Sequence, residues 1–217
     1  CLRNKCNNSV ITCRETVTNR SDAYEKIILD KNADILRLPA IALRGLVVFP
    51  GNIIHFEVGR KKSIAAIEWA MSNNNAVFLT AQQDMDVEDP GFKNLYAYGV
   101  VAEVKQVLRV SDELVKVLVE GKYRAKLLTL DSSGRFLLAS TKAAALRGTK
   151  SVDSARVEAL VRSVKEAFEE YLSLNPRLSK DVVYTIITNE DAALLCDYIP
   201  ANLLLKYTDK QALLNEG

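Results

Sequence analysis

Few residues of this 217-residue chain are of a type that carries out chemistry. Its single histidine, His55, alternates with apolar residues on the expected outer face of a strand, where histidine is most often a plain surface residue. A Ser-His-Asp triad would depend on this histidine alone. The chain also has no GxSxG motif of the kind that presents a nucleophilic serine. We therefore assign no catalytic residue.

Two segments come closest to a phosphate or metal site. LRGTKS (146–151) lacks the first glycine of a phosphate-binding loop, and a threonine separates Gly148 from Lys150. The acidic run DMDVEDPG (84–91) contains Pro90 and Gly91, which are typical of a solvated turn. We expect the first segment to be a flexible connector and the second a turn, and we assign no cofactor to this chain.

Charge and cysteine are unevenly distributed along the chain. The net charge is +2, but residues 1–21 carry four basic residues and one acidic residue, so the rest of the chain sums to −1. This nearly neutral body makes nucleic acid an unlikely partner by charge. Cys1, Cys6 and Cys13 are separated by four and six residues, which does not match zinc knuckles.

The remaining cysteine, Cys196, stands alone in the body of the chain. A single cysteine there is typical of a reducing compartment, and we expect a cytoplasmic protein. No apolar run approaches the ~20 residues that span a bilayer, so we expect no membrane partner. Residues 1–34 have no clear periodicity in their first 21 positions, and we expect a leader that is disordered or not native.

Residues 35–142 have the pattern of short strands separated by turns, which favours a closed or partly closed barrel. Strand-like runs are LRLPAIAL and LVVFP, broken by Pro39, Gly45 and Pro50, and NIIHFEV, which alternates. One helix, KKSIAAIEWAM, interrupts the strands and should bury a stripe that includes Met71. The long alternating run YGVVAEVKQVLRV should point five side chains inward: Val100, Ala102, Val104, Leu108 and Val110.

After a connector at 143–152, residues 153–217 have the period of helices. A long helix should end at Asn175-Pro176, Ser179 should cap the next one, and a shorter helix should end at Pro200. The apolar face predicted for the long helix consists of Val157, Leu160, Val161, Val164, Phe168, Tyr171 and Leu172.

The last helix shows the pattern of a capping box, Thr208 followed three residues later by Gln211. Leu213 and Leu214 should pack back onto the other helices, and the final carbonyl groups should have only water as partners. The fold class predicted from the whole pattern is α+β, with a β-rich lobe followed by a lobe of bundled helices.

Four segments, in this order, resemble the N-terminal domain of Lon, the ATP-dependent serine protease. The first is LPAIALRGLVVFPGNIIHFEVGRKKSIAAIEWAM (38–71), and the second is EDPGFKNLYAYG (88–99). The third is VKVLVEGKYRAKLL (115–128), and the fourth is YIPANLLLKYTDKQALLNE (198–216). The resemblance covers residues 35–217, and it implies that the β-rich lobe is a PUA-like pseudo-barrel.

The resemblance implies a domain that recognises unfolded or degron-bearing proteins and delivers them to a hexameric Lon ring. In that family an ATPase module, which uses ATP and Mg²⁺, and a protease domain with a serine-lysine dyad follow this domain. We expect the chain to be a piece of such a protein, degrading misfolded and regulatory proteins. The alternatives are a stand-alone Lon-like adaptor and, less favoured by charge, a PUA-like RNA-binding module.

Five residues are candidates for contact with substrates or for shaping the loops that make contact. Arg44 lies in an Arg-Gly turn, Phe49 and Pro50 precede a second turn, and Gly121 and Arg124 lie in the motif VEGKYRA. Glycine at 121 would permit a β-bulge or a positive φ where two strands meet. A role in shaping the barrel is the more common one for each of these residues taken alone.

We predict that the purified chain hydrolyses neither ATP nor peptide bonds, since it has no phosphate-binding loop and no nucleophile-base pair. Phosphate release from ATP and fluorescence release from a quenched protein substrate measure the two activities. Turnover that disappears when a residue within 1–217 is substituted would contradict this prediction.

Overall fold

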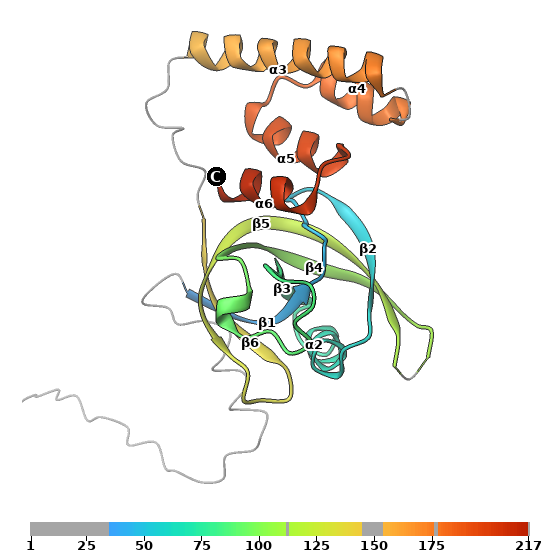
Figure 1. Ribbon diagram of the computed structural model, residues 1–217, viewed down its shortest axis with the longest axis vertical. Coiled ribbons are helices and arrows are strands. Elements are labelled where there is room, and N and C mark those ends of the chain that lie inside the picture. The colour runs from blue at the N-terminus through green and yellow to red at the C-terminus, as the bar shows by residue number, and fades with distance from the viewer. Residues whose placement is uncertain (1–34, 112, 145–153, 176–177, 217) are drawn as a thin grey trace, which may run out of the picture.

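A computed structural model describes residues 35–111, 113–144, 154–175 and 178–216. A strand-rich barrel lies below a group of helices, α3 to α6, and α6 is the member of this group nearest the barrel (Figure 1). The expected leader at 1–34 and most of the expected connector at 143–152 lie outside the described residues. Within the described ranges, no helix is both long enough and apolar enough to cross a membrane.

The β-rich part is a six-stranded sheet that closes on itself. Its order is β2-β5-β4-β3-β1-β6. A further pairing of β5 with β6 closes the strands β5-β4-β3-β1-β6 into a ring, and β2 remains outside this ring, paired with β5. This arrangement confirms the predicted α+β barrel fold. The strands are β1 (Ile35–Leu43), β2 (Ile53–Val58), β3 (Ala76–Ala81), β4 (Tyr98–Arg109), β5 (Val115–Asp131) and β6 (Leu137–Ala143).

Strand β4 follows the predicted alternation only as far as Val104. The register between β4 and β5 shifts between Val104 and Gln106, which is the mark of a β-bulge. A bulge exchanges the two faces of a strand. Leu108 and Val110, predicted to point inward, are therefore more than half exposed, whereas Val100, Ala102 and Val104 are buried as predicted.

The first predicted strand is not broken at Pro39, because β1 runs through this residue without interruption. Pairing with β3 begins only at Ala40, so the missing N–H of the proline lies before that parallel ladder. The predicted strand LVVFP is also wrong, since residues 46–49 belong to no strand. The turns on either side are confirmed by positive φ angles of 62° at Gly45 and 71° at Gly51.

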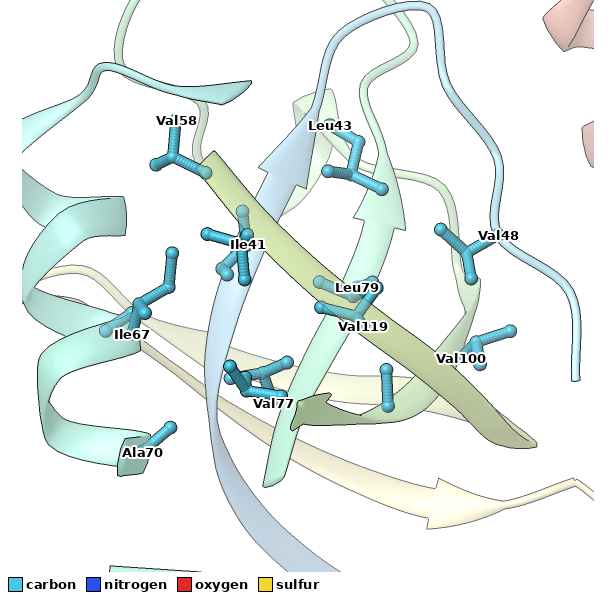
Figure 2. Packing of buried hydrophobic residues seen from close by; sticks show 14 of the residues in the cluster. Ile41, Leu43, Val48, Val58, Ile67, Ala70, Val77, Leu79, Val100 and Val119 are labelled. Atoms are coloured by element: carbon cyan, nitrogen blue, oxygen red, sulfur yellow. The ribbon is translucent and has the colours of Figure 1, made fainter. Parts of the chain in front are cut away.

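The main hydrophobic core lies between the barrel wall and α2 (Lys61–Met71), as Figure 2 shows. Ile67 and Ala70 of the helix face Ile41 and Val77 from the sheet, and all four are buried. Met71 was predicted on the buried stripe, but it is exposed at the end of the helix. A short 3-10 turn, η1 (Phe92–Asn94), precedes β4.

The second part contains α3 (Ser154–Leu174), α4 (Lys180–Thr188), α5 (Ala192–Asn202) and α6 (Tyr207–Asn215). Ser179 caps α4 as predicted, accepting a hydrogen bond from the Val182 N–H at 3.3 Å. Helix α5 does not end at Pro200 but continues for two more residues. Of the predicted face of α3, Phe168 is buried, while Leu160 and Val164, in the first half and at the middle of the helix, are exposed.

Helix α6 differs from its prediction in two ways. It begins two residues earlier than expected, so Thr208 lies inside it, and Lys206 at the N-cap makes no side-chain cap. The Gln211 side chain instead donates to the Tyr98 carbonyl oxygen on β4 at 2.9 Å. Leu214 packs into the main core of the barrel rather than onto the other helices, and Leu213 is exposed.

A close backbone contact holds the loop after Phe49 against β5. The Gly51 N–H donates to the Gly121 carbonyl oxygen at 2.8 Å, and the Gly121 N–H donates to the Asn52 carbonyl oxygen at 3.0 Å. A Cβ atom at Gly121 would overlap the carbonyl oxygen of Phe49. Lys122 is the extra residue of a neighbouring bulge, and φ at Gly121 is not positive. Close approach, not an unusual φ, therefore requires glycine here.

We predict that Gly121→Ala lowers the free energy of unfolding by about 3 kcal/mol, because the methyl group forces the two backbones apart. Urea unfolding followed by circular dichroism measures this change. Gly134→Ala is the matched control, since its Cβ would lie 3.6 Å from the nearest atom, the Phe136 carbonyl oxygen. Equal stability of the two variants would show that the contact is not tight.

Candidate functional site

A cleft of about 690 Å³ opens on the barrel between β2, the end of β1 and the first turn of α2. Loop residues after β1 and after β3 complete its rim. Its lining is Ile41, Ala42, Leu43, Arg44, Leu46, Phe56, Glu57, Val58, Gly59, Arg60, Lys61, Lys62, Ser63, Glu88 and Asp89.

Arg60 fixes one wall of the cleft. Its guanidinium donates to the Ala42 carbonyl oxygen at 3.2 Å, to the Val87 carbonyl oxygen at 3.2 Å, and to the side-chain oxygen of Gln82. Gln82 is fully buried and also donates to the Val87 carbonyl oxygen, at 3.0 Å. Burial lowers the pKa of Arg60 below its usual value, and the positive charge of Arg44 lowers this pKa further.

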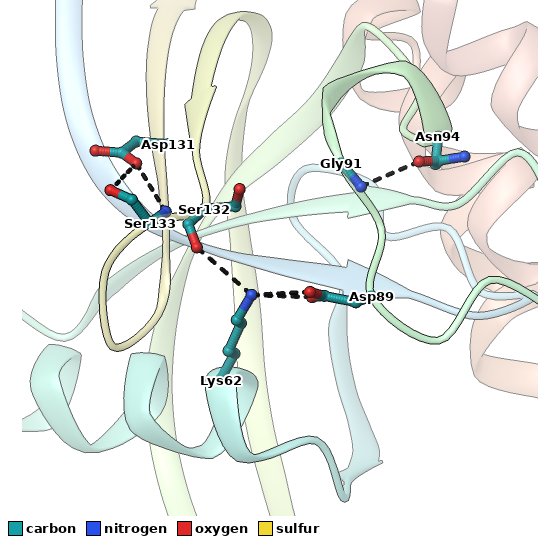
Figure 3. A network of polar contacts seen from close by, with 7 residues as sticks. All are labelled: Lys62, Asp89, Gly91, Asn94, Asp131, Ser132 and Ser133. Carbon is teal, nitrogen blue, oxygen red and sulfur yellow. Dashed lines mark hydrogen bonds and ion pairs between the residues drawn. The ribbon is translucent and has the colours of Figure 1, made fainter.

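The rim is held by ion pairs and turns (Figure 3). Lys62, on α2, contacts the Asp89 carboxylate at 3.0 Å and the Ser132 carbonyl oxygen at 3.5 Å, so it joins two loops far apart in sequence. Each loop is closed internally as well. The Asn94 side chain accepts from the Gly91 N–H, and Asp131 accepts from the Ser133 N–H and hydroxyl. This rim is preorganised rather than loose.

The lining of the cleft offers backbone, apolar and charged groups. Its lining includes neither cysteine nor histidine, and its one hydroxyl group belongs to Ser63, which is buried. His55 lies on the exposed face of β2. What the cleft offers is backbone at the ends of two strands, partly buried apolar walls at Leu46 and Phe56, and a charged rim.

The five residues chosen from the sequence lie in three different places. Arg44 is exposed on the rim of the cleft, where it donates to the Val87 carbonyl oxygen at 3.4 Å. Phe49 is fully buried in the main core, and Pro50 lies beside it over Gly121. Phe49, Pro50 and Gly121 shape the loop and do not line the cleft. Sequence reasoning did not single out Arg60, although the VGR motif contains it.

Arg124 joins the barrel to the helices. Its side chain is only 6% exposed, and its Nε donates to the Asp197 carboxylate of α5 at 3.0 Å, with Nη2 donating to the same oxygen. Nη1 donates to the carbonyl oxygens of Leu213, at 3.4 Å, and Leu214, at 3.0 Å. Two of the last carbonyls of α6 thus have a protein partner, contrary to the expectation of water alone.

Asp197, the partner of Arg124, was not identified from the sequence. Burial raises the pKa of its carboxyl group above the usual value, while the hydrogen bonds and charge of Arg124 act in the opposite direction. The two residues lie 73 positions apart, and no local pattern links them. An acidic residue on an otherwise apolar helix was the only available signal.

Large apolar side chains are exposed on the helices as well. Leu160 and Val164 on α3, and Tyr184 and Ile187 on α4, are all more than 40% exposed. Their exposure leaves apolar surface away from the cleft, of a kind that marks interaction surfaces when it is contiguous.

Comparison with known proteins gives a consistent set of relatives. Residues 37–217 match the family described as the ATP-dependent protease La (LON) substrate-binding domain. A Lon protease of Desulforamulus reducens is 38% identical over 183 residues, which are 84% of this chain and 22% of that protein. A Lon protease of Escherichia coli K12 is 36% identical over 184 residues, 85% of this chain and 23% of that protein.

Solved structures agree on the fold. The N-terminal domain of Mycobacterium avium complex Lon protease is similar with a TM-score of 0.59 at 16% identity, covering 83% of this chain and 97% of that one. A Lon N-terminal domain protein from Xanthomonas campestris has a TM-score of 0.57 at 14% identity, covering 83% and 90%. The chain spans about a fifth of the length of the curated relatives that it matches.

We predict that Arg124→Met lowers the free energy of unfolding by about 3–5 kcal/mol, because it leaves Asp197 buried without its partner. Arg135→Met is the control, since Arg135 is exposed where it pairs with Glu68, and this change should be nearly neutral. In the double variant Arg124→Met with Asp197→Leu, most of the loss should be recovered. Denaturant unfolding measures all three, and a neutral Arg124→Met would contradict the assigned role.

Proposed function

This chain belongs to the family of Lon substrate-binding domains, and from that premise we propose that it holds unfolded segments of proteins for an ATP-dependent protease. The observation that carries the proposal is the family match over residues 37–217. A rigid barrel with a preorganised cleft and no assigned catalytic group among the described residues supports it. We propose that this domain recognises the substrate protein and does not itself cleave it.

We further propose the setting in which the domain acts. The whole protein would be a cytoplasmic serine protease that assembles as a hexameric ring and uses ATP and Mg²⁺ to degrade misfolded and regulatory proteins. Its relatives bear the name Lon protease, and this chain spans about a fifth of their length, which supports that setting. We assign none of the described residues to ATP or Mg²⁺.

An adaptor without protease activity is the second reading of the same domain. Such an adaptor would use the same cleft and would differ only in the domains or proteins to which it is attached. RNA binding is less favoured, because the chain outside residues 1–21 sums to a charge of −1.

The proposal predicts weak, saturable binding of unfolded protein. The probe is fluorescent α-lactalbumin that has been reduced and carboxamidomethylated, and the control is the same protein in its native, disulfide-bonded form. We expect the unfolded probe alone to bind, with an affinity that changes less than about threefold between about 50 and about 500 mM salt.

Lack of binding to the unfolded probe, or equal binding of both forms, would overturn the proposal. Tight binding of a single-stranded RNA that weakens steeply with salt would favour the RNA reading instead.

A further inference from the structure

The barrel wall is open between β2 and the end of β1. β5 pairs with β4 on one edge, while β2 and β6 share its other edge end to end, at Val115–Glu120 and Ala125–Asp131. β1 pairs with β6 only as far as Ala40. Its last residues, Ile41–Leu43, therefore have β3 on one side and no strand on the other among the described residues. The last three residues of β1, Ile41–Leu43, and the last three of β2, Phe56–Val58, line the same cleft.

The two edges differ in how many of their backbone N–H and C=O groups already have hydrogen-bond partners. On β1, the Ala42 carbonyl oxygen accepts from Arg60 at 3.2 Å. On β2, no backbone N–H or C=O of Ile53–Val58 has a hydrogen-bond partner other than β5 within the described part of the chain. In an antiparallel pair about half of these groups point away from the partner strand. Within the described residues, the outer edge of β2 therefore presents a row of donors and acceptors without partners, about 20 Å long.

The space beside this edge has the size and walls that an extended chain needs. The cleft measures about 690 Å³, within the range of ligand-binding clefts. Its apolar lining includes Phe56 and Val58 of β2, and Leu43 and Leu46 at and after the end of β1. The rim ions Lys62 and Asp89 are paired with each other, so they impose no strong charge requirement on an occupant.

We propose that β2 is a strand acceptor, to which an extended segment of an unfolded polypeptide adds as a further strand within this cleft. The inference rests on the proposed function. It specifies which groups of the substrate the domain binds, namely main-chain N–H and C=O groups. Every unfolded protein carries these groups, and folded proteins have already paired them. Alternate side chains of the bound segment would contact the apolar walls, which gives a preference for alternating apolar residues.

The edge is protected against pairing with other folded proteins. β2 has only six residues, and its outward side chains include His55 and Glu57. Charged side chains and short length are the means by which natural sheets prevent edge-to-edge association. A single flexible chain can enter the cleft, whereas a second sheet would meet the rim loops held by Lys62.

N-methylation of the ligand backbone tests the proposal. The probe is a fluorescent peptide of about ten residues in which valine alternates with threonine. Two variants carry N-methyl groups on the valines only or on the threonines only, so that each loses one row of N–H groups. We expect one variant to lose at least about tenfold in affinity and the other to stay within about threefold, because only one row faces β2.

Amide exchange of the whole described domain locates the peptide. Addition of the unmethylated peptide should slow exchange at alternate residues of Ile53–Val58 by about tenfold or more, with no change at Tyr184–Ile187 on α4. Equal affinity of the two methylated variants would overturn the proposal, as would protection on α3 or α4 in place of β2. Either result, with binding of unfolded α-lactalbumin intact, would leave the proposed function standing. Failure of unfolded α-lactalbumin to bind would instead remove the proposed function itself.

Discussion

A β-strand has only two edges, and the way β5 divides its edges governs the rest of this domain. One edge pairs with β4, and the other is shared between β2 and β6. The half that pairs with β6 closes the barrel, and the half that pairs with β2 leaves the wall open beside β1. The closed half supplies stability, and the open half supplies the cleft in which we place the substrate.

A buried cation helps to join the barrel to the helices, together with the Gln211 hydrogen bond to Tyr98 and the packing of Leu214. A guanidinium group has five donors, and Arg124 makes four hydrogen bonds with them, to the carboxylate of α5 and to the terminal carbonyls of α6. Removal of a charged group from water is costly unless each of its donors finds a partner. The positions of α5 and α6 are therefore coupled to each other and to β5, whereas α3 and α4 pack mainly around a small core of their own.

The sequence was informative wherever a period continued without interruption. The faces of β2, the extent of α2 and the cap at Ser179 followed from alternation, from the 3.6-residue period and from a polar side chain. Sequence-based prediction failed where a local change in the backbone reversed which side chains point inward. The bulge before Gln106 did this for Leu108. Long-range pairs such as Arg124 with Asp197 leave no local pattern, and the cleft is built from segments whose proximity only the closed barrel creates.

The packing of Leu214 into the barrel core has a mechanical consequence. The chain leaves the barrel after β6, runs through α3, α4 and α5, and returns to the barrel with α6. A pulling force applied between β1 and α6 would pass through the Leu214 packing and the Arg124 hydrogen bonds. Helices α3 and α4, which lie between β6 and these attachments, would then carry no tension until both α5 and α6 detached from the barrel.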